Sequence, residues 1–219
     1  MVQLTRIYTR TGDRGETRLS DMSKARKTDP RVAAYGETDE ANCVIGLALA
    51  NRDMPPGVAG VLAEVQNELF DVGADLSNPV IESPRWEPLR IVQASVDRLE
   101  EWCDEFGGSL PELRSFILPG GTQTGALLHL ARTVVRRAER AAWEAAEVYG
   151  LGVPENPDAP GGVNPLALTY LNRLSDLLFI LSRVVNTGTE ETLWVPGKDR
   201  EPVDSRSRRQ RERIERANS

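Results

Sequence analysis

Five long stretches of this chain repeat apolar residues at helical spacing, and few stretches alternate as a strand would. The expected helices span residues 30–51, 58–78, 87–106, 122–149 and 165–187. Asp29-Pro30 and Asn164-Pro165 are start signals, because each pairs a capping side chain with a proline at the first helical position. Long amphipathic helices joined by short connections predict an all-α fold, a five-helix up-and-down bundle.

Arginines recur on the fourth expected helix, in the segment GTQTGALLHLARTVVRRAERAAWEAAE. Arg132, Arg136 and Arg140, here called the arginine stripe, are four residues apart and share one helical face, with Arg137 and Glu139 beside them. Like charges at this spacing repel, so the stripe lowers stability unless an anion neutralises it. Two interpretations stay open: a solvated basic face, or a site for a phosphate-rich ligand.

The N-terminal segment LTRIYTRTGDRGETRLS has turn residues but no strong helical period. Its threonines and arginines surround Gly12 and Gly15, where the backbone can approach a ligand closely. Successive backbone N–H groups in such turns can form an anion-binding nest. The chain has no GxxxxGK[ST] string, so this segment is not a Walker A loop. A surface turn and a phosphate-binding loop both remain compatible with it.

Polar residues interrupt two of the expected helices. In the first helix, Asp39 and Glu40 are either an exposed carboxylate pair or include a buried acid that an arginine of the stripe would neutralise. The fifth helix carries a polar patch opposite its leucines, made of Asn172, Arg173, Ser175 and Asp176. Asn172 either hydrogen-bonds a sugar or base edge or is simply exposed.

Charge is distributed unevenly along the chain. Its 219 residues carry a net charge of −6, which argues against general nucleic-acid binding. Residues 197–219 hold eight Lys or Arg against five Asp or Glu, a balance of +3. We expect one helical domain over residues 1–196 and a polar, mobile tail over residues 197–219. A nucleic-acid-binding arm is the weaker interpretation of this tail.

Cysteine and hydropathy patterns bear on location and on metals. Cys43 and Cys103 fall in helical patterns and are expected to be reduced core thiols of a cytoplasmic protein. With one histidine, His129, and no Cys/His cluster, no structural zinc site is expected. We also expect no membrane span and no signal segment, because no apolar run or charged-then-apolar start supports one.

Four motifs occur in order along the chain: TRIYTRTGDRGETRL, KTDPRVAAYGETDEAN, FILPGGTQTGALLHLARTVVRRAER and YLNRLSDLLF. With them the chain resembles the ATP:cob(I)alamin adenosyltransferases of the propanediol-utilisation (PduO) type. The resemblance runs from about Arg6 to Asn186, with divergent stretches at residues 78–113 and 149–165. The tail after about Val195 has no secure counterpart.

The resemblance implies a fold, an assembly and a reaction. It implies a five-helix bundle that forms a homotrimer with active sites between subunits. The reaction transfers the 5′-deoxyadenosyl group of ATP to cobalt of reduced cobalamin and releases triphosphate. It also implies Mg²⁺ as a cofactor, a flavin-dependent reductase as electron donor and an adenosylcobalamin-dependent acceptor enzyme, without a membrane or a nucleic acid.

The resemblance also implies site residues. The family's ATP site falls on Thr9, Arg10, Thr11, Gly12, Thr17, Arg18, Lys27, Arg136, Arg137, Glu139, Arg140 and Asn172. Its corrinoid-facing phenylalanine matches Phe116, in the apolar stretch that ends at the Pro119-Gly120-Gly121 turn. Its subunit-bridging salt bridge matches Asp39 with Arg132. The implied catalytic set is therefore Phe116, Asp39 and Arg132, with no protein-held metal.

The implied chemistry is consistent with these residues. Co(I) is itself the nucleophile, so no protein nucleophile or general base is required. The triphosphate leaving group gains negative charge, which fixed cations and a divalent metal would stabilise. The alternative is a nucleotide- and corrinoid-binding bundle without catalysis, used for delivery or regulation. A nucleic-acid-binding protein acting through the tail is a second alternative.

Overall fold

The structure is a computed structural model that describes residue 8, residues 10–200 and residues 213–216. This part of the chain is mostly helical, with α1 (Pro30–Leu49), α2 (Pro56–Leu76), α3 (Gln93–Gly107), α4 (Gln123–Tyr149), α5 (Pro165–Val185) and a 3-10 turn, η1 (Gly197–Asp199). Two short strands, β1 (Glu16–Arg18) and β2 (Lys24–Arg26), pair antiparallel. The expected all-α class is therefore correct for the helices but omits this small sheet.

The chain divides into two compact units. The larger, called here the helical unit, contains the residues up to Pro111 and Pro119–Glu190. The smaller, called the Phe116 unit, contains Glu112–Leu118 and the residues from Glu191 onward. Residues 201–212 and 217–219 of the expected tail lie outside the described residues. The domain boundary after residue 196 stays a prediction.

Capping side chains mark where three of the helices begin. The Asp29 carboxylate accepts a hydrogen bond from the amide of Arg31 at the start of α1, and Thr122 Oγ1 accepts one from Gly125 at the start of α4. Asn164 caps α5 in the same way through Leu166. These side chains satisfy N–H groups that have no partner within the helix.

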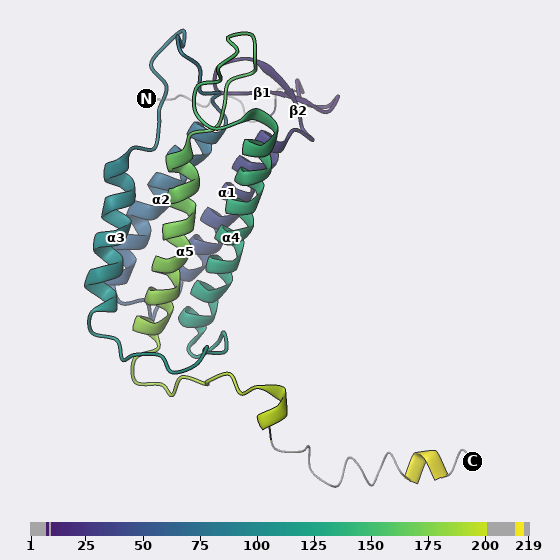
Figure 1. The fold of residues 1–219 in the computed structure, drawn as a ribbon. Helices are drawn as coiled ribbons and strands as arrows, with labels where there is room; N and C mark the ends of the chain where they lie inside the picture. The colour runs from purple at the N-terminus through teal and green to yellow at the C-terminus, as the bar shows by residue number, and fades with distance from the viewer. Residues whose placement is uncertain (1–7, 9, 201–212, 217–219) are drawn as a thin grey trace. The chain divides into compact units, whose positions relative to one another are not determined.

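All five helices contribute buried apolar side chains to the core of the helical unit. In Figure 1, α1, α4 and α5 lie side by side, with α2 packed on α1 and α3 on α5. The inward face of α4 is rich in alanine, including fully buried Ala131, Ala138 and Ala142. Small side chains at these positions let neighbouring helices approach closely. Leucines of α5, such as Leu174 and Leu178, fill the space opposite.

The third helix begins later than expected, at Gln93 rather than at residue 87. Its cap residue, Val92, is extended, with φ −113° and ψ 164°. Directly before it, the amide of Ile91 donates to Asp75 Oδ2 at 2.7 Å. The preceding segment is therefore bonded to the end of α2 instead of forming a helical turn. Helical periodicity alone does not reveal such a distant partner.

Two other expectations need correction. Cys43 is a free thiol, as expected, but its side chain is exposed rather than in the core, whereas Cys103 is half-buried. Ser175 is buried on α5 and so does not belong to an exposed polar patch. Among the described residues, no helix combines the length and apolarity that a membrane crossing requires.

Candidate active site

The N-terminal hairpin encloses a hollow of about 800 Å³. Its lining residues are Arg10, Thr11, Gly12, Asp13, Arg14, Glu16, Thr17, Arg18 and Lys24. Four of these side chains are cationic and two are anionic, and two threonines add hydroxyl groups. A concave surface with excess positive charge and nearby hydroxyls suits a polyphosphate, because charge-assisted hydrogen bonds to phosphate oxygens are among the strongest polar contacts.

Backbone geometry shapes this hairpin hollow. Gly15 has φ +79° and donates its amide to the carbonyl of Gly12 at 3.2 Å, while the amide of Lys27 donates to the carbonyl of Gly15 at 2.8 Å. A Cβ on Gly12 would lie 3.1 Å from Lys27 Nζ, so glycine leaves room for the ammonium group. Arg10 also has a positive φ, 60°, which is uncommon for a residue other than glycine.

The arginine stripe on α4 is partly buried at one end and exposed at the other. Burial, and then the charge of Arg136, lowers the pKa of Arg132, whose Nε has no hydrogen-bond partner among the described residues. Arg136 and Arg140 are exposed, and Arg140 donates to the carbonyl of Arg136 at 3.3 Å. Within the described part of the chain, no ion pair neutralises the stripe.

Arg137 lies beside the stripe but in a different environment. Its Nε donates to Glu37 Oε2 at 2.5 Å, and its Nη2 donates to Glu40, both on α1. These hydrogen bonds raise the pKa of Arg137. Its charge is therefore already compensated within this chain, unlike the charges of Arg136 and Arg140.

Glu139 and Asn172, predicted from distant motifs, meet between α4 and α5. Asn172 Nδ2 donates to Glu139 Oε1 at 3.0 Å, and Arg173 Nη1 donates to Asn172 Oδ1 at 2.9 Å. Arg173 Nε in turn donates to Glu100 of α3 at 2.7 Å. This chain of contacts fixes the amide orientation of Asn172, because its oxygen faces a guanidinium and its nitrogen a carboxylate.

Phe116 belongs to the smaller unit, where it is held beside the chain segment after residue 190. Its carbonyl accepts from the amide of Trp194 at 2.7 Å, and the amide of Leu118 donates to Thr192 at 2.8 Å. The rings of Phe116 and Trp194 meet edge-to-face with centroids 6.3 Å apart. The Phe116 side chain remains 78% exposed, which makes it an apolar surface available to a ligand.

Asp39 is exposed in this single chain and lines a second hollow of about 420 Å³, to which Arg18, Tyr35 and Phe70 also contribute. Of the two interpretations of the acids on α1, exposure is therefore correct within one chain. The pairing of Asp39 with Arg132 concerns two subunits and stays a prediction. Thr9, also expected in the ATP site, lies outside the described residues.

The chain belongs to the cobalamin adenosyltransferase family, whose model matches residues 7–185. It is 56% identical over 199 residues to the corrinoid adenosyltransferase of Mycobacterium tuberculosis (strain H37Rv), covering 91% of this chain and 97% of that protein. It is 42% identical over 184 residues to the corrinoid adenosyltransferase of Bacillus subtilis, covering 83% and 86%.

Solved structures extend this likeness to the fold. A variant PduO-type ATP:corrinoid adenosyltransferase from Lactobacillus reuteri, complexed with cobalamin and ATP, is similar to this chain with a TM-score of 0.76 and 35% identity. The match covers 89% of this chain and 99% of that structure. Another variant of the same enzyme, complexed with ATP, has a TM-score of 0.72 and 34% identity, covering 86% and 100%. The expected membership in the PduO-type adenosyltransferases is thus confirmed.

Sequence reasoning missed three contacts around these residues. Glu37 was not singled out, although its spacing of three residues from Glu40 places both on one face of α1. Glu100 lies on a helix outside the four motifs. Trp194 follows Leu193 in a short apolar run before the polar tail. Such a run indicates that Trp194 packs against another segment, which in the structure is the one that contains Phe116.

Proposed function

We propose that this chain catalyses transfer of the 5′-deoxyadenosyl group of ATP to Co(I) of cob(I)alamin, giving adenosylcobalamin and triphosphate. The chain is a corrinoid adenosyltransferase by family, and related structures bind both substrates. The observation that carries the residue assignment is the hairpin hollow, where cations and hydroxyl groups line about 800 Å³ at one end of the helical unit. ATP and cobalamin are substrates in this account.

The reaction needs little covalent chemistry from the protein. The Co(I) electron pair attacks C5′ of ATP, a cobalt–carbon bond forms and cobalt becomes formally Co(III). The bond from C5′ to oxygen breaks, and its electron pair leaves with triphosphate. Because charge grows on triphosphate, fixed cations lower the barrier. We assign this role to Arg136, Arg140 and the hairpin cations Arg10 and Arg18.

The remaining ATP contacts divide between the ends of the nucleotide. Thr9, Thr11, Gly12, Thr17 and Lys27 would bind phosphate oxygens through hydroxyl, amide and ammonium groups. Glu139 and Asn172 would bind the ribose or the base, because their contact already orients one amide and one carboxylate. Arg137 is assigned to the same site by resemblance, and its bonds to Glu37 and Glu40 suit a role in holding that site in place.

Mg²⁺ is part of the proposal. Among the described residues, no group of three or more His, Cys, Asp or Glu side chains could hold a metal ion. Mg²⁺ commonly binds through one or two carboxylates together with substrate phosphates, and Asp13 and Glu16 line the hairpin hollow. These residues fit an ion that enters with the nucleotide, where it would supply further neutralisation of triphosphate charge.

Phe116 is proposed to face the lower side of the corrin ring. An exposed apolar ring there would exclude an axial ligand from cobalt, which makes reduction to Co(I) easier. The experiment is Phe116→Ala, assayed with chemically pre-reduced corrinoid and with corrinoid reduced in the presence of a protein reductase. We expect a larger loss in the second assay. Wild-type rates in both assays would remove this role.

We also propose the assembly of the family, a homotrimer of five-helix up-and-down bundles with active sites between subunits. Two features support an intersubunit contact: exposed Asp39 and the buried, unpartnered Nε of Arg132. Each would satisfy the other across an interface. A double-mutant cycle with Asp39→Asn and Arg132→Met should show coupling in trimer stability, and additive effects would count against the pairing.

The cellular setting extends the proposal. A flavin-dependent reductase would supply the electron for Co(I), and an adenosylcobalamin-dependent enzyme would accept the product. A cytoplasmic location and a separate tail over residues 197–219 complete the proposal.

The experiment that tests the reaction mixes the protein with ATP, Mg²⁺ and chemically reduced cobalamin. We expect the absorbance of cob(I)alamin to be replaced by that of adenosylcobalamin, with one triphosphate released per turnover. In a control reaction, ATP is replaced by 5′-deoxyadenosine, which has no leaving group at C5′. Its spectrum should remain that of cob(I)alamin. Binding of both substrates without a new cobalt–carbon bond would favour the non-catalytic alternative.

A further inference from the structure

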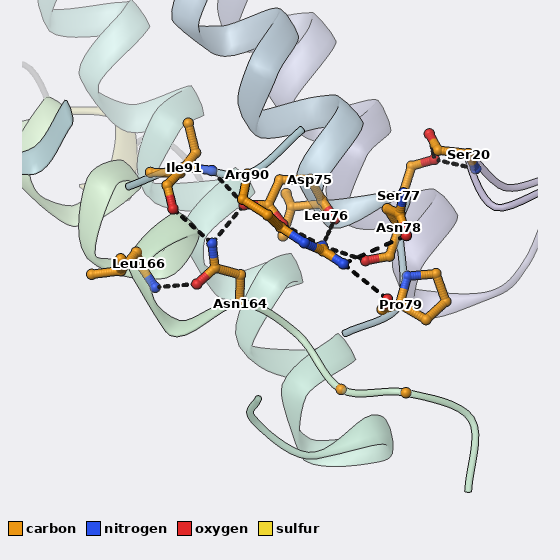
Figure 2. A network of polar contacts seen from close by, with 12 residues as sticks. Ser20, Asp75, Leu76, Ser77, Asn78, Pro79, Arg90, Ile91, Asn164 and Leu166 are labelled. Atoms are coloured by element: carbon orange, nitrogen blue, oxygen red, sulfur yellow. Dashed lines mark hydrogen bonds and ion pairs between the residues drawn. The ribbon is translucent and has the colours of Figure 1, made fainter. Parts of the chain in front are cut away.

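The C-terminal end of α2 is a junction for several distant segments (Figure 2). Helix C-termini leave backbone carbonyls without partners in the helix. Here five successive carbonyls, those of residues 75–79, all accept hydrogen bonds from elsewhere, and we call this segment the α2 hub. The donors are Arg90 to Asp75, Asn78 and Pro79 (3.1, 2.5 and 2.9 Å), Arg31 to Leu76 (3.4 Å) and the Ser20 amide to Ser77 (3.1 Å).

The Asp75 side chain bonds the α2 hub to two other segments of the chain. Its carboxylate is fully buried and pairs with Arg90 at 2.6 Å. It also accepts from the amide of Ile91 at 2.7 Å and from Asn164 Nδ2 at 2.6 Å. These contacts connect the end of α2 to the segment before α3 and to Asn164, the capping residue of α5. A buried carboxylate with three donors is held in one orientation.

Ser77 connects the α2 hub to the N-terminal hairpin. The Ser20 amide donates to both the carbonyl and the Oγ of Ser77, at 3.1 and 3.0 Å. The two hydroxyl oxygens are 2.7 Å apart and share a further hydrogen bond. Figure 2 shows Ser20 approaching Ser77 from the hairpin side of the hub. Three hydrogen bonds therefore converge on one pair of serines.

Ser20 lies at the turn of the hairpin, between β1 and β2. The turn is closed by hydrogen bonds from Leu19 to Ser23 and from Met22 to Leu19, each 2.9 Å, and Met22 has a positive φ of 70°. Arg18, which lines the hairpin hollow, donates to the Met22 carbonyl at 2.9 Å. The anchor at Ser20 is thus two residues from a cation of the proposed triphosphate site.

A hairpin this small does not hold its own position. Each strand has three residues, and isolated two-stranded hairpins are marginally stable in water. At its other end the hairpin continues directly into α1 through Asp29. Contact at the turn therefore decides how the lining cations are directed relative to the helices.

We propose that Ser77 is a positioning residue that, through Ser20, holds the hairpin hollow in place for the triphosphate of ATP. The proposal rests on the adenosyltransferase function proposed above. In this view the α2 hub provides a fixed support, and the serine pair transmits that support to the nucleotide-binding turn. Ser77 is not among the residues that line the hairpin hollow, so its loss should weaken ATP binding more than it slows the chemical step.

The test is Ser77→Ala, which removes the hydroxyl and keeps the backbone carbonyl. We expect the KM for ATP to rise about tenfold, equivalent to ~1.4 kcal/mol, with kcat within about twofold of wild type and an unchanged KM for cobalamin. Amide hydrogen exchange of the peptide covering residues 16–27, measured without nucleotide, should be faster by about fivefold or more. Exchange in α4 and α5 should not change.

Two variants complete the design. Ser77→Thr keeps a hydroxyl and should restore both the KM for ATP and the exchange rate to near wild type. Thr169→Ala removes a hydroxyl whose hydrogen bond goes to Pro165 in its own helix, at 3.1 Å, and should change neither quantity. Ser20→Ala combined with Ser77→Ala should have little more effect than Ser77→Ala alone, because the Ser77 hydroxyl takes part in both side-chain contacts of this pair.

The exchange measurement separates this proposal from the proposed function. If the wild-type protein formed no adenosylcobalamin but Ser77→Ala still accelerated exchange in residues 16–27, the anchor would stand and the reaction would fall. Wild-type exchange in the Ser77→Ala hairpin would overturn the anchor. An equal rise of KM for both substrates would also overturn it, because general loosening of the fold would then explain the effect.

Discussion

The arginines that donate to the α2 hub and those of the arginine stripe differ in how the protein compensates their charge. Arg31 is almost fully buried, and it donates to the carbonyls of Gly161 and Gly162 and faces the Tyr149 ring at 4.4 Å. Arg90 is bonded to a buried carboxylate and three carbonyls. Arg136 and Arg140, in contrast, are exposed and make no ion pair among the described residues.

This difference separates arginines that stabilise the fold from arginines whose charge is available to bind a ligand. Burial lowers the pKa of Arg31, and the backbone carbonyls that accept its hydrogen bonds replace part of the hydration that this charge loses. The exposed stripe has no such compensation, and its repulsion would be relieved by an anion. The number of arginines in the sequence does not separate these groups, whereas their partners in the fold do.

The largest expected effect is on stability, at the α2 hub. Arg90→Ala should lower the free energy of unfolding by about 3–5 kcal/mol, because it leaves the Asp75 carboxylate buried without its cation. Urea denaturation measures this change. Arg173→Ala, which removes an exposed pair with Glu100, is the control and should cost less than about 1 kcal/mol. If Arg90→Ala lowered the free energy of unfolding no more than Arg173→Ala does, the distinction between buried and exposed arginines would be wrong.

The next effect is on activity, at the stripe. Arg136→Ala should lower kcat/KM for ATP by about 100-fold, because a cation that stabilises the leaving triphosphate is removed. Its thermal midpoint should stay the same or rise, since a repulsive neighbour of Arg132 and Arg140 is lost. Arg52→Ala, an exposed charge between α1 and α2, should leave kcat/KM within about twofold. A stable Arg136→Ala protein with wild-type kcat/KM would contradict the assignment.

A smaller effect concerns Tyr149, whose hydroxyl donates to Asp29 at 2.6 Å. Burial and then Asp29 raise the pKa of Tyr149 to about 12, above the value near 10 expected for the unfolded chain. The unfolded state therefore loses this proton first, and the stability it contributes is present below pH 10 and is lost as pH rises towards 12. Tyr149→Phe should lower the free energy of unfolding by about 1 kcal/mol at pH 7 and flatten that alkaline decline. An unchanged slope between pH 10 and 12 would argue against this pairing.

The smallest effect is the response to salt, which should differ between the two sets. Raising NaCl from about 0.05 to 0.5 M should weaken ATP binding about threefold, because exposed cations are screened. The difference in unfolding free energy between wild type and Arg90→Ala should change little over the same range, since the Asp75–Arg90 pair is shielded from solvent. Isothermal titration and urea denaturation provide the two readouts. Equal salt dependence in both would show that burial does not separate these arginines.

Local patterns in the sequence predicted the helices well. The expected ends of α1, α2, α4 and α5 agree with the structure to within two residues, because apolar spacing and capping residues act over a few neighbouring positions. The predicted start of α3 was wrong, because the segment before this helix is hydrogen-bonded to the end of α2. The short strands of the hairpin were missed, since three residues give too little alternation to detect.

The site was predictable only where motifs supplied it. The hairpin residues and the Glu139–Asn172 contact follow from the resemblance, and the structure brings each group together. The α2 hub was not predictable, because Arg31 and Arg90 have no local feature that reveals carbonyl partners elsewhere in the chain. Asp39 and Arg132 are assigned to different subunits, so neither sequence spacing nor one chain can test them.

The most direct measurement of the central claim is a crystal structure of the protein with ATP and Mg²⁺. The account predicts the triphosphate against the hairpin hollow, within hydrogen-bond distance of Arg136, with Arg31 and Arg90 keeping their present partners. A triphosphate bound away from both the hairpin and the stripe, or one that draws Arg90 from Asp75, would contradict it.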